Sequence, residues 1–374
     1  MMLHDEWLYQ IALTRVEGIG DFLARLLVLE FGSASAVFKA KKKLLERLEK
    51  IGPFRAKAIA SFNDFNRCEK EIEFLIKHKI QVVFFNHHHY PKQLYDCYDA
   101  PVLLYFKGSA TLENQRFLSI VGTRNPSIYG IEWTRNFVKD LQGSEIIIVS
   151  GLAEGIDTIA HESALQNGLN SIGVLGHGLH TIYPAVNRKL AARMIEQGGL
   201  LTHFPSGTNP ERQHFPSRNR ITGGICDALV VVETGIRGGS LITADLAYGY
   251  QKEIFALPGR VTDLMSAGTN QLIQQQQAIP IHNAFGFLDY MKWRDNDNKI
   301  TTEKENSSLF FYPSEREKKL LDLMIDPIHI DELSGKMEET HSQLASILLQ
   351  LELKGVVMNK PGKRYQLNPT IALL

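Results

Sequence analysis

Between Arg116 and Arg260 the chain repeats short, continuous runs of Val, Ile and Leu that end in glycine-containing loops. These runs are FLSIVG (Phe117–Gly122), GVLG (Gly173–Gly176), LVVVE (Leu229–Glu233) and IFALPG (Ile254–Gly259). Strands that are apolar on both faces are typical of a parallel sheet covered by helices on both sides. The repeated strand–helix order therefore predicts an α/β fold, with an extended Rossmann-like, doubly wound, mostly parallel sheet.

The same patterning predicts where the elements lie. We expect strands at residues 81–85, 102–106, 117–121, 145–150, 171–175, 200–203, 228–233, 253–257 and 279–281. We expect helices at residues 130–141, 156–166, 186–197, 219–226, 241–250 and 269–276. This series assigns residues 79–289 to the Rossmann-like domain.

Two smaller domains are expected on either side of the sheet. Residues 1–78 read as all-helical, and the glycine-containing turns before Asp21 and Phe54 predict a helix-hairpin-helix (SAM-like) domain. Such a hairpin can offer backbone N–H groups to a phosphate, or its helices can simply pack on each other. Residues 290–313 are charged and aperiodic, which predicts a linker.

Residues 314–374 predict a winged-helix domain. Helices are expected at 315–324, 330–336 and 341–354, and strands at 355–359 and 364–368. The helix that would read duplex DNA, HSQLASILLQLELK, is apolar and has a single lysine. This composition favours a docking role over duplex recognition.

Whole-chain composition excludes several classes of protein. Lys+Arg and Asp+Glu are both 41, so any anion-binding site has to be local. No uninterrupted apolar stretch of about 18 residues occurs, so we expect no membrane span. The N-terminus lacks a basic signal region, and Cys68, Cys97 and Cys226 are far apart. These features predict a cytoplasmic protein without a zinc ribbon.

The loops that follow the strands carry arginine and almost no carboxylate. No acid occurs in residues 114–131, 171–195 or 212–220, and the last of these segments reads RQHFPSRNR. In an open parallel sheet, ligands lie outside the carboxyl ends of the strands. A cationic surface with an aromatic side chain suits the phosphate chain of a nucleic acid.

Glycines in these loops let the backbone approach a ligand closely. Gly151, Gly155, Gly238 and Gly239 precede expected helices, whose positive ends would face the ligand. Ser240 and Thr243 add hydroxyl groups at one such helix start.

Motifs for other chemistries are absent or incomplete. The sequence lacks G-x-G-x-x-G with its ribose-binding acid and lacks the P-loop motif, so no nucleotide cofactor is expected. His87, His88 and His89 stand in sequence without a paired acid nearby, so a polar loop is favoured over a metal site.

One pair of residues has the spacing of a catalytic dyad. Asp157 and His161 lie four residues apart on an expected helix, where an acid can orient a histidine as a general base. The alternative is an intrahelical hydrogen bond that fixes the turn. Since no nucleophile or second acid completes a hydrolytic set, no enzymatic activity is expected.

Several segments, in order, resemble the DNA-processing protein A family, also called DprA or Smf. They are SIVGTRNPSIYG (Ser119–Gly130), IVSGLAEGIDTIAHESAL (Ile148–Leu165), VLGHGLHTIYPAVN (Val174–Asn187), FPSRNRITGG (Phe215–Gly224), GGSLITADLA (Gly238–Ala247), ALPG (Ala256–Gly259) and AGTNQLI (Ala267–Ile273). The resemblance implies a single-stranded-DNA-binding protein of natural transformation that protects incoming strands and loads the RecA recombinase. It also implies a homodimer formed through the Rossmann-like domain, and no enzymatic activity.

The resemblance also implies which residues contact DNA. They are Arg124, Phe215, Arg218, Asn219, Arg220, Gly238, Gly239, Ser240 and Thr243. Phe215 would stack on a base and Arg124 would contact phosphate. The chain departs from the family pattern at residues 202–203 and 222–225, but neither departure removes a cationic or aromatic group.

Two other functions stay open on the residues alone. A nucleotide-derivative hydrolase on a similar sheet needs a P-G-G-x-G-T-x-x-E loop, and Pro258–Thr262 matches it only in part. A transcription regulator needs a basic recognition helix, which the C-terminal domain lacks.

Overall fold

The computed structural model describes residues 3–294, 315–324, 326–337, 339–353, 356–360 and 362–368. The chain divides into two compact units, Met1–Arg294 and Asp295–Leu374. Trp293 packs on Phe287, with ring centroids 5.5 Å apart, so the first unit continues past the expected boundary at residue 289. The rest of the expected linker, residues 295–313, lies outside the described residues.

The first unit, which we call the sheet unit, is built on a nine-stranded sheet, and this confirms the expected doubly wound fold. Its strand order is β1 (Gln81–Phe84), β2 (Leu103–Gly108), β6 (Gly198–Thr202), β5 (Ser171–Val174), β4 (Ile146–Ser150), β3 (Arg116–Val121), β7 (Ala228–Val231), β8 (Glu253–Ala256) and β9 (Ile279–Pro280). The pairs from β6 to β9 are parallel, whereas β1 and β2 run antiparallel at one edge.

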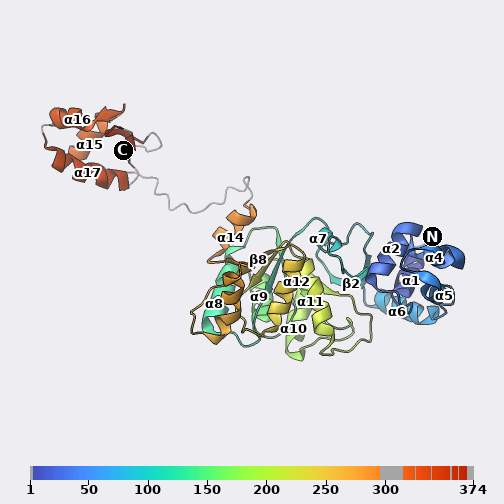
Figure 1. The fold of residues 1–374 in the computed structure, drawn as a ribbon. Helices are drawn as coiled ribbons and strands as arrows, with labels where there is room; N and C mark the ends of the chain where they lie inside the picture. The colour runs from blue at the N-terminus through green and yellow to red at the C-terminus, as the bar shows by residue number, and fades with distance from the viewer. Residues whose placement is uncertain are drawn as a thin grey trace. The chain divides into compact units, whose positions relative to one another are not determined.

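Helices cover both faces of this sheet, as the apolar strands require (Figure 1). α11 (His214–Gly224) and α12 (Gly239–Gly249) pack together on one face, where Ile221 and Ala247 join the core. α8 (Ile128–Asp140), α9 (Ile156–Gln166) and α14 (Ala284–Met291) contribute to the core of the opposite face. The other helices of this region are α7 (Lys92–Tyr95), α10 (Arg188–Glu196) and α13 (Ala267–Gln274).

The strand order reverses direction between β3 and β7. The chain runs outward from β3 through β4 and β5 to β6, and then returns to the other side of β3 as β7. At such a switch point the loops after the two central strands diverge and leave a crevice for a ligand.

α11 begins at His214, five residues before the expected start at Asn219. The earlier start is compatible with Pro216, which lies in the first turn of the helix. A proline there costs no hydrogen bond, because the N–H groups of the first turn have no partner within the helix. Phe215 and Arg218 are therefore held on a helix.

The N-terminal segment is all-helical, as expected. It consists of α1 (Leu3–Leu13), α2 (Asp21–Phe31), α3 (Ala34–Lys39), α4 (Lys42–Arg47), α5 (Gly52–Ala60) and α6 (Phe65–Lys77). Gly18 and Gly52 have φ values of 75° and 64°, which glycine adopts readily at the two hairpin turns. The segment contacts the rest of the first unit through partly buried polar groups, such as Ser206 N donating to Glu71 Oε1 at 2.8 Å.

The second unit is a winged helix with the expected three helices: α15 (Glu315–Asp322), α16 (Ile330–Met337) and α17 (His341–Leu353). The expected wing strands are β11 (Val357–Lys360) and β12 (Arg364–Leu367). A two-residue strand, β10 (Ile328–His329), pairs with β12 and was too short to be predicted. Throughout the described ranges, no helix is long and apolar enough to cross a membrane.

Candidate nucleic-acid interface

A cavity of about 800 Å³ lies at the switch point of the sheet. We call it the switch-point pocket. The end of β3, the turn before α9, the first turns of α11 and the loop leading into α12 line it. Its lining includes Arg124, Gly151, Asp157, Tyr183, Arg212, Phe215, Arg218, Asn219, Thr222, Arg237, Gly238, Gly239, Ser240 and Thr243. Most of the residues that the resemblance named are therefore brought together here.

The β3–α8 loop presents Arg124 at the mouth of the pocket. Arg124 is exposed, but its loop is anchored by the buried Glu233, which follows β7. The Glu233 carboxylate accepts from Ser127 N at 2.9 Å and from Ser127 Oγ at 2.5 Å. The Thr123 amide donates to the Glu233 carbonyl at 2.7 Å. This anchor was not predicted, because Ser127 and Glu233 are 106 residues apart in the chain.

Arg218 forms the floor of the pocket. It is only 7 % exposed, and its Nη1 donates to the Val174 carbonyl at 2.7 Å. A Cβ on Gly151 would lie 2.0 Å from Arg218 Nη1, so the glycine makes room for the guanidinium. Arg218 Nε also donates to Asn219 Oδ1 at 3.1 Å. The positive charge under the pocket is thus fixed in place.

The Asp157 carboxylate also lines the pocket, and it is the one carboxylate among the described lining residues. It accepts from the amides of Gly151 and Ala153 at 3.1 and 3.3 Å. Burial raises the pKa of Asp157, and the nearby Arg218 charge opposes this effect. Burial likewise lowers the pKa of Arg218, and Asp157 opposes it. The two charges therefore stabilise each other.

Asp157 and His161 do not form a dyad. His161 is fully buried, and its Nδ1 lies 2.7 Å from Ser171 Oγ. Burial lowers its pKa to about 3, which keeps the ring neutral. The expected alternative, a hydrogen bond between the two residues, is wrong as well: Asp157 fixes the turn through backbone amides instead.

The aromatic side of the pocket consists of Phe215 and Tyr183. Their ring centroids are 6.1 Å apart at 41°, and Tyr183 is 48 % exposed. Phe215 is half-buried, and a Cβ on Gly176 would lie 3.1 Å from its Cδ1. Phe215 thus packs against the protein with part of its ring and lines the pocket as well.

The N-terminus of α12 closes the remaining side. Ser240 is 8 % exposed and Thr222, on α11, is 1 % exposed. Neither Ser240 Oγ nor Thr222 Oγ1 has a hydrogen-bond partner among the described residues. Buried hydroxyl groups are nearly always paired, so a partner from outside the chain is expected here. A helix N-terminus favours an anion as that partner.

Arg220 is not part of this pocket. Its Nη2 lies 2.9 Å from Asp21 Oδ2 on α2, and its Nη1 donates to the Asp99 carbonyl at 2.8 Å. The sequence grouped it with Arg218, but two residues on a helix are about 200° apart. Arg220 instead joins α11 to the N-terminal helices.

Arg212 and Arg237 are pocket residues that the sequence did not select. Both are exposed and line the cavity. The signal that would have found them is the absence of acid in their segments, 212–220 and 234–244.

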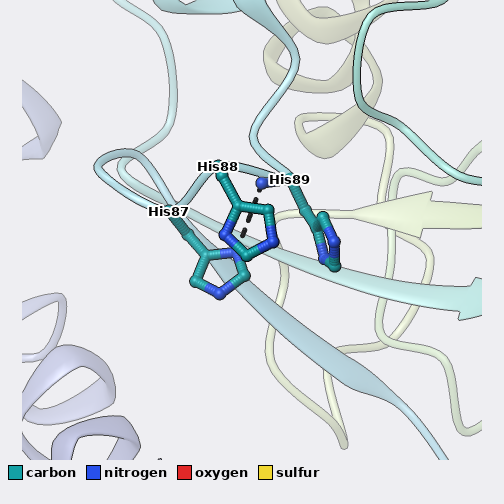
Figure 2. Close-up of side chains that lie close together, drawn as sticks. All are labelled: His87, His88 and His89. Carbon is teal, nitrogen blue, oxygen red and sulfur yellow. Dashed lines mark hydrogen bonds between the residues drawn. The ribbon is translucent and has the colours of Figure 1, made fainter.

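His87, His88 and His89 lie outside the pocket, in the turn between β1 and α7 (Figure 2). Their imidazole rings gather on one side of the turn, and ring nitrogens from all three lie within 4.8 Å of one another.

Known protein families match both units of the chain. The family model for DNA recombination-mediator protein A matches residues 81–292, and the model for the DprA winged helix domain matches residues 313–363. Protein Smf of Synechocystis sp. is 31 % identical over 404 residues, which cover 98 % of this chain and 100 % of that protein. Protein Smf of Escherichia coli is 36 % identical over 280 residues, covering 73 % of this chain and 74 % of that protein.

Solved structures agree with these matches. The crystal structure of DNA processing protein A from Streptococcus pneumoniae is 32 % identical with a TM-score of 0.65, and the match covers 75 % of this chain and 97 % of that one. The Helicobacter pylori DNA processing protein A, whose structure describes a single-stranded DNA binding mode, is 30 % identical with a TM-score of 0.52, covering 57 % and 96 %. The chain belongs to the DprA/Smf family of DNA recombination-mediator proteins.

Proposed function

We propose that the chain binds single-stranded DNA in the switch-point pocket. The observation that supports this most directly is the pair of buried hydroxyl groups, Ser240 Oγ and Thr222 Oγ1, without a partner among the described residues. Ser240 lies in the first turn of α12 and Thr222 near the end of α11, and both line the pocket together with arginines and an aromatic side chain. Phosphate oxygens accept hydrogen bonds from such hydroxyl groups and from the amides of a first helical turn.

Different residues of the pocket are suited to contact phosphate groups and bases. Three exposed arginines can adjust to a flexible DNA backbone, namely Arg124, Arg212 and Arg237, whereas the buried Arg218 provides a fixed positive charge. Phe215 and Tyr183 offer ring surface to an unpaired base. Stacking of this kind needs a base whose face is free, so it favours a single strand over a duplex.

Binding of labelled single- and double-stranded DNA of the same length tests this proposal. We expect a clear preference for the single strand and little dependence on its sequence. Arg124→Ala should weaken binding, whereas Arg135→Ala, which removes an exposed arginine from α8 outside the pocket, should not. Equal affinity for both DNA forms, or equal effects of both substitutions, would contradict the proposal.

The hydroxyl groups need a separate test. Ser240→Ala removes a buried oxygen that has no partner within the described protein, so its loss should weaken DNA binding without lowering the stability of the free protein. Ser119→Ala is a matched control, because Ser119 Oγ is buried and already donates to the Thr222 carbonyl at 2.7 Å. The Ser119→Ala protein should be less stable than the unsubstituted protein, but once folded it should bind DNA with unchanged affinity.

On the strength of family membership, we further propose that the chain acts in DNA uptake and natural transformation, inside the cytoplasm. There it would protect incoming strands and load RecA onto them, as a homodimer formed through the sheet unit. Light scattering of the chain at several concentrations tests the dimer. RecA filament formation on protein-coated single strands, measured with and without the chain, tests the loading.

We also propose that the chain is not an enzyme, in contrast to the alternative of a nucleotide-derivative hydrolase. The separation of Asp157 from His161 supports this, because the acid cannot orient the histidine as a base. Nucleotides and DNA should remain intact on incubation with the chain and divalent metal. Turnover that is lost in Asp157→Ala would restore the hydrolase alternative.

A further inference from the structure

The three consecutive histidines of the β1–α7 turn form a compact cluster of metal-ligating atoms (Figure 2). One nitrogen from each ring lies within 4.8 Å of the other two. Ring centroids are 4.3 Å apart for His87 and His88, and 4.0 Å apart for His88 and His89. Zinc–nitrogen bonds of about 2.0–2.1 Å place tetrahedral ligands about 3.4 Å apart. Small rotations of these partly exposed rings therefore bring them into that geometry.

A fourth ligand lies beside the cluster. Glu113, in the loop between β2 and β3, places Oε2 4.0 Å from His89 Nε2. Both side chains are about two-fifths exposed, so each can move toward a shared ion. Three imidazoles with one carboxylate form a donor set suited to Zn²⁺ and to neighbouring transition metals.

The backbone of the turn is fixed before any ion binds. His87 N donates to the Phe84 carbonyl at 2.8 Å, and Tyr90 N donates to the His87 carbonyl at 2.9 Å. The buried Tyr90 hydroxyl donates to the Pro101 carbonyl at 2.6 Å. These bonds hold the backbone on both sides of the histidines. Metal binding therefore requires little further ordering of the backbone.

The ring nitrogen of His87 has only a weak partner within the turn. His87 Nδ1 accepts only a long bond, 3.3 Å, from His89 N, so an ion can replace this bond at little cost.

We propose that His87, His88 and His89 bind one divalent transition-metal ion of the zinc class, with Glu113 as the fourth ligand. The site is separate from the switch-point pocket, whose lining contains none of these four residues. A bound ion would join the β1–α7 turn to the β2–β3 loop, so it would stabilise this edge of the sheet unit and have no direct part in DNA binding.

Zinc titration of the full, untagged chain tests the site. The readouts are competition with a chromophoric chelator and the visible absorption of Co²⁺ in place of Zn²⁺. We expect one ion per chain and four-coordinate Co²⁺ bands. The variant His88→Asn/His89→Asn keeps the His87 contact within the turn, and it should bind Zn²⁺ at least about 100-fold more weakly, because the loss of a mere outer-shell partner already costs 10–100-fold.

Matched controls decide whether the cluster is responsible. His282→Asn removes one exposed histidine outside the cluster and should leave Zn²⁺ affinity and the Co²⁺ spectrum unchanged. Unchanged zinc binding by His88→Asn/His89→Asn, or an equal loss in His282→Asn, would overturn the proposal. Glu113→Gln should weaken binding about tenfold, and unchanged affinity would overturn its assignment as the fourth ligand. Single-stranded DNA affinity in the presence of a chelator should be the same for all these variants.

Discussion

The two compact units of the chain bury different kinds of side chain. In the winged helix, all the described buried side chains are apolar, and they form one cluster around Leu320, Leu344 and Leu348. Its described ion pairs, such as Arg316–Glu339, are exposed. The sheet unit also buries polar groups, and six of its described buried polar residues, Asp157 and Arg218 among them, line one cavity.

This difference indicates which buried residues serve to stabilise the fold and which are suited to bind a ligand. An apolar core is sufficient to stabilise a small three-helix domain. Buried polar groups without partners lower stability. Among the described residues, both buried hydroxyl groups without a partner, on Ser240 and Thr222, line the switch-point pocket. The contrast supports the switch-point pocket as the site of the proposed DNA binding.

The largest effect is expected from the buried arginine. Arg218→Ala leaves the Asp157 carboxylate buried beside no cation, so it should lower the free energy of unfolding of the sheet unit by about 3–5 kcal/mol. Arg316→Ala breaks an exposed pair in the winged helix and should change stability far less. Denaturant unfolding of both variants measures the loss in free energy of unfolding. Equal losses would show that the buried arginine is no more important for stability than the exposed one. Arg218→Ala/Asp157→Ala should regain part of the loss.

Acid should affect the two units differently. Burial lowers the pKa of His161 and of His203 to about 3, so their neutral forms support the fold above pH 6.5. Since the unfolded chain takes up these protons, this stability is lost as the pH falls from about 6.5 toward 3, by about 2 kcal/mol for each group at pH 5. Between pH 7 and pH 5, the melting temperature of the sheet unit should fall more than that of the winged helix, whose His341 is exposed. His161→Gln should reduce the pH dependence.

Removal of one aromatic ring should distinguish DNA stacking from core packing. Phe215→Ala should weaken single-strand binding by about 1–3 kcal/mol and leave the salt dependence unchanged, because no charge is lost. Leu349→Ala, at an exposed apolar residue of α17, should leave binding unchanged. A Phe215→Ala protein that melts at a much lower temperature but binds normally would show that the ring serves the core.

A charge substitution should change the salt dependence. Arg124→Ala should reduce the slope of log affinity against log salt by about 0.7, the value for one phosphate contact on a single strand. Arg364→Ala, in the exposed part of the wing, should leave the slope unchanged. Affinity measured across a salt series gives both slopes, and a change confined to the wing variant would move the DNA site to that domain.

The smallest effect is expected from removal of the winged helix. Deletion of residues 295–374 should leave single-strand affinity within about twofold, because every residue that lines the switch-point pocket lies in the first unit. A loss of a hundredfold in the same binding assay would show that the winged helix takes part in holding the strand.

Much of the fold follows from sequence periodicity. Every expected strand of the sheet unit is present. Short, continuous apolar runs between turns are typical of strands that helices cover on both faces. The family motifs also predicted that Arg124, Phe215 and the start of α12 would meet, since parallel strands end at one edge of the sheet.

Other features depend on contacts that the sequence does not encode locally. Arg218 and Arg220 are two residues apart, yet one is under the pocket and the other contacts α2, because the helix turns between them. Asp157 and His161 had the spacing of a pair, but Gly151 and Ser171 provide better partners once the strands are assembled.

The sequence by itself determined the layered α/β architecture, the winged helix and the family, because these depend on periodic patterns and on motifs within short segments. Only the tertiary structure decided which polar groups are buried without partners, as at Ser240 and Thr222, and that three neighbouring histidines lie beside Glu113. Burial and hydrogen-bond satisfaction depend on segments far apart in the chain, and they become fixed only when those segments pack together.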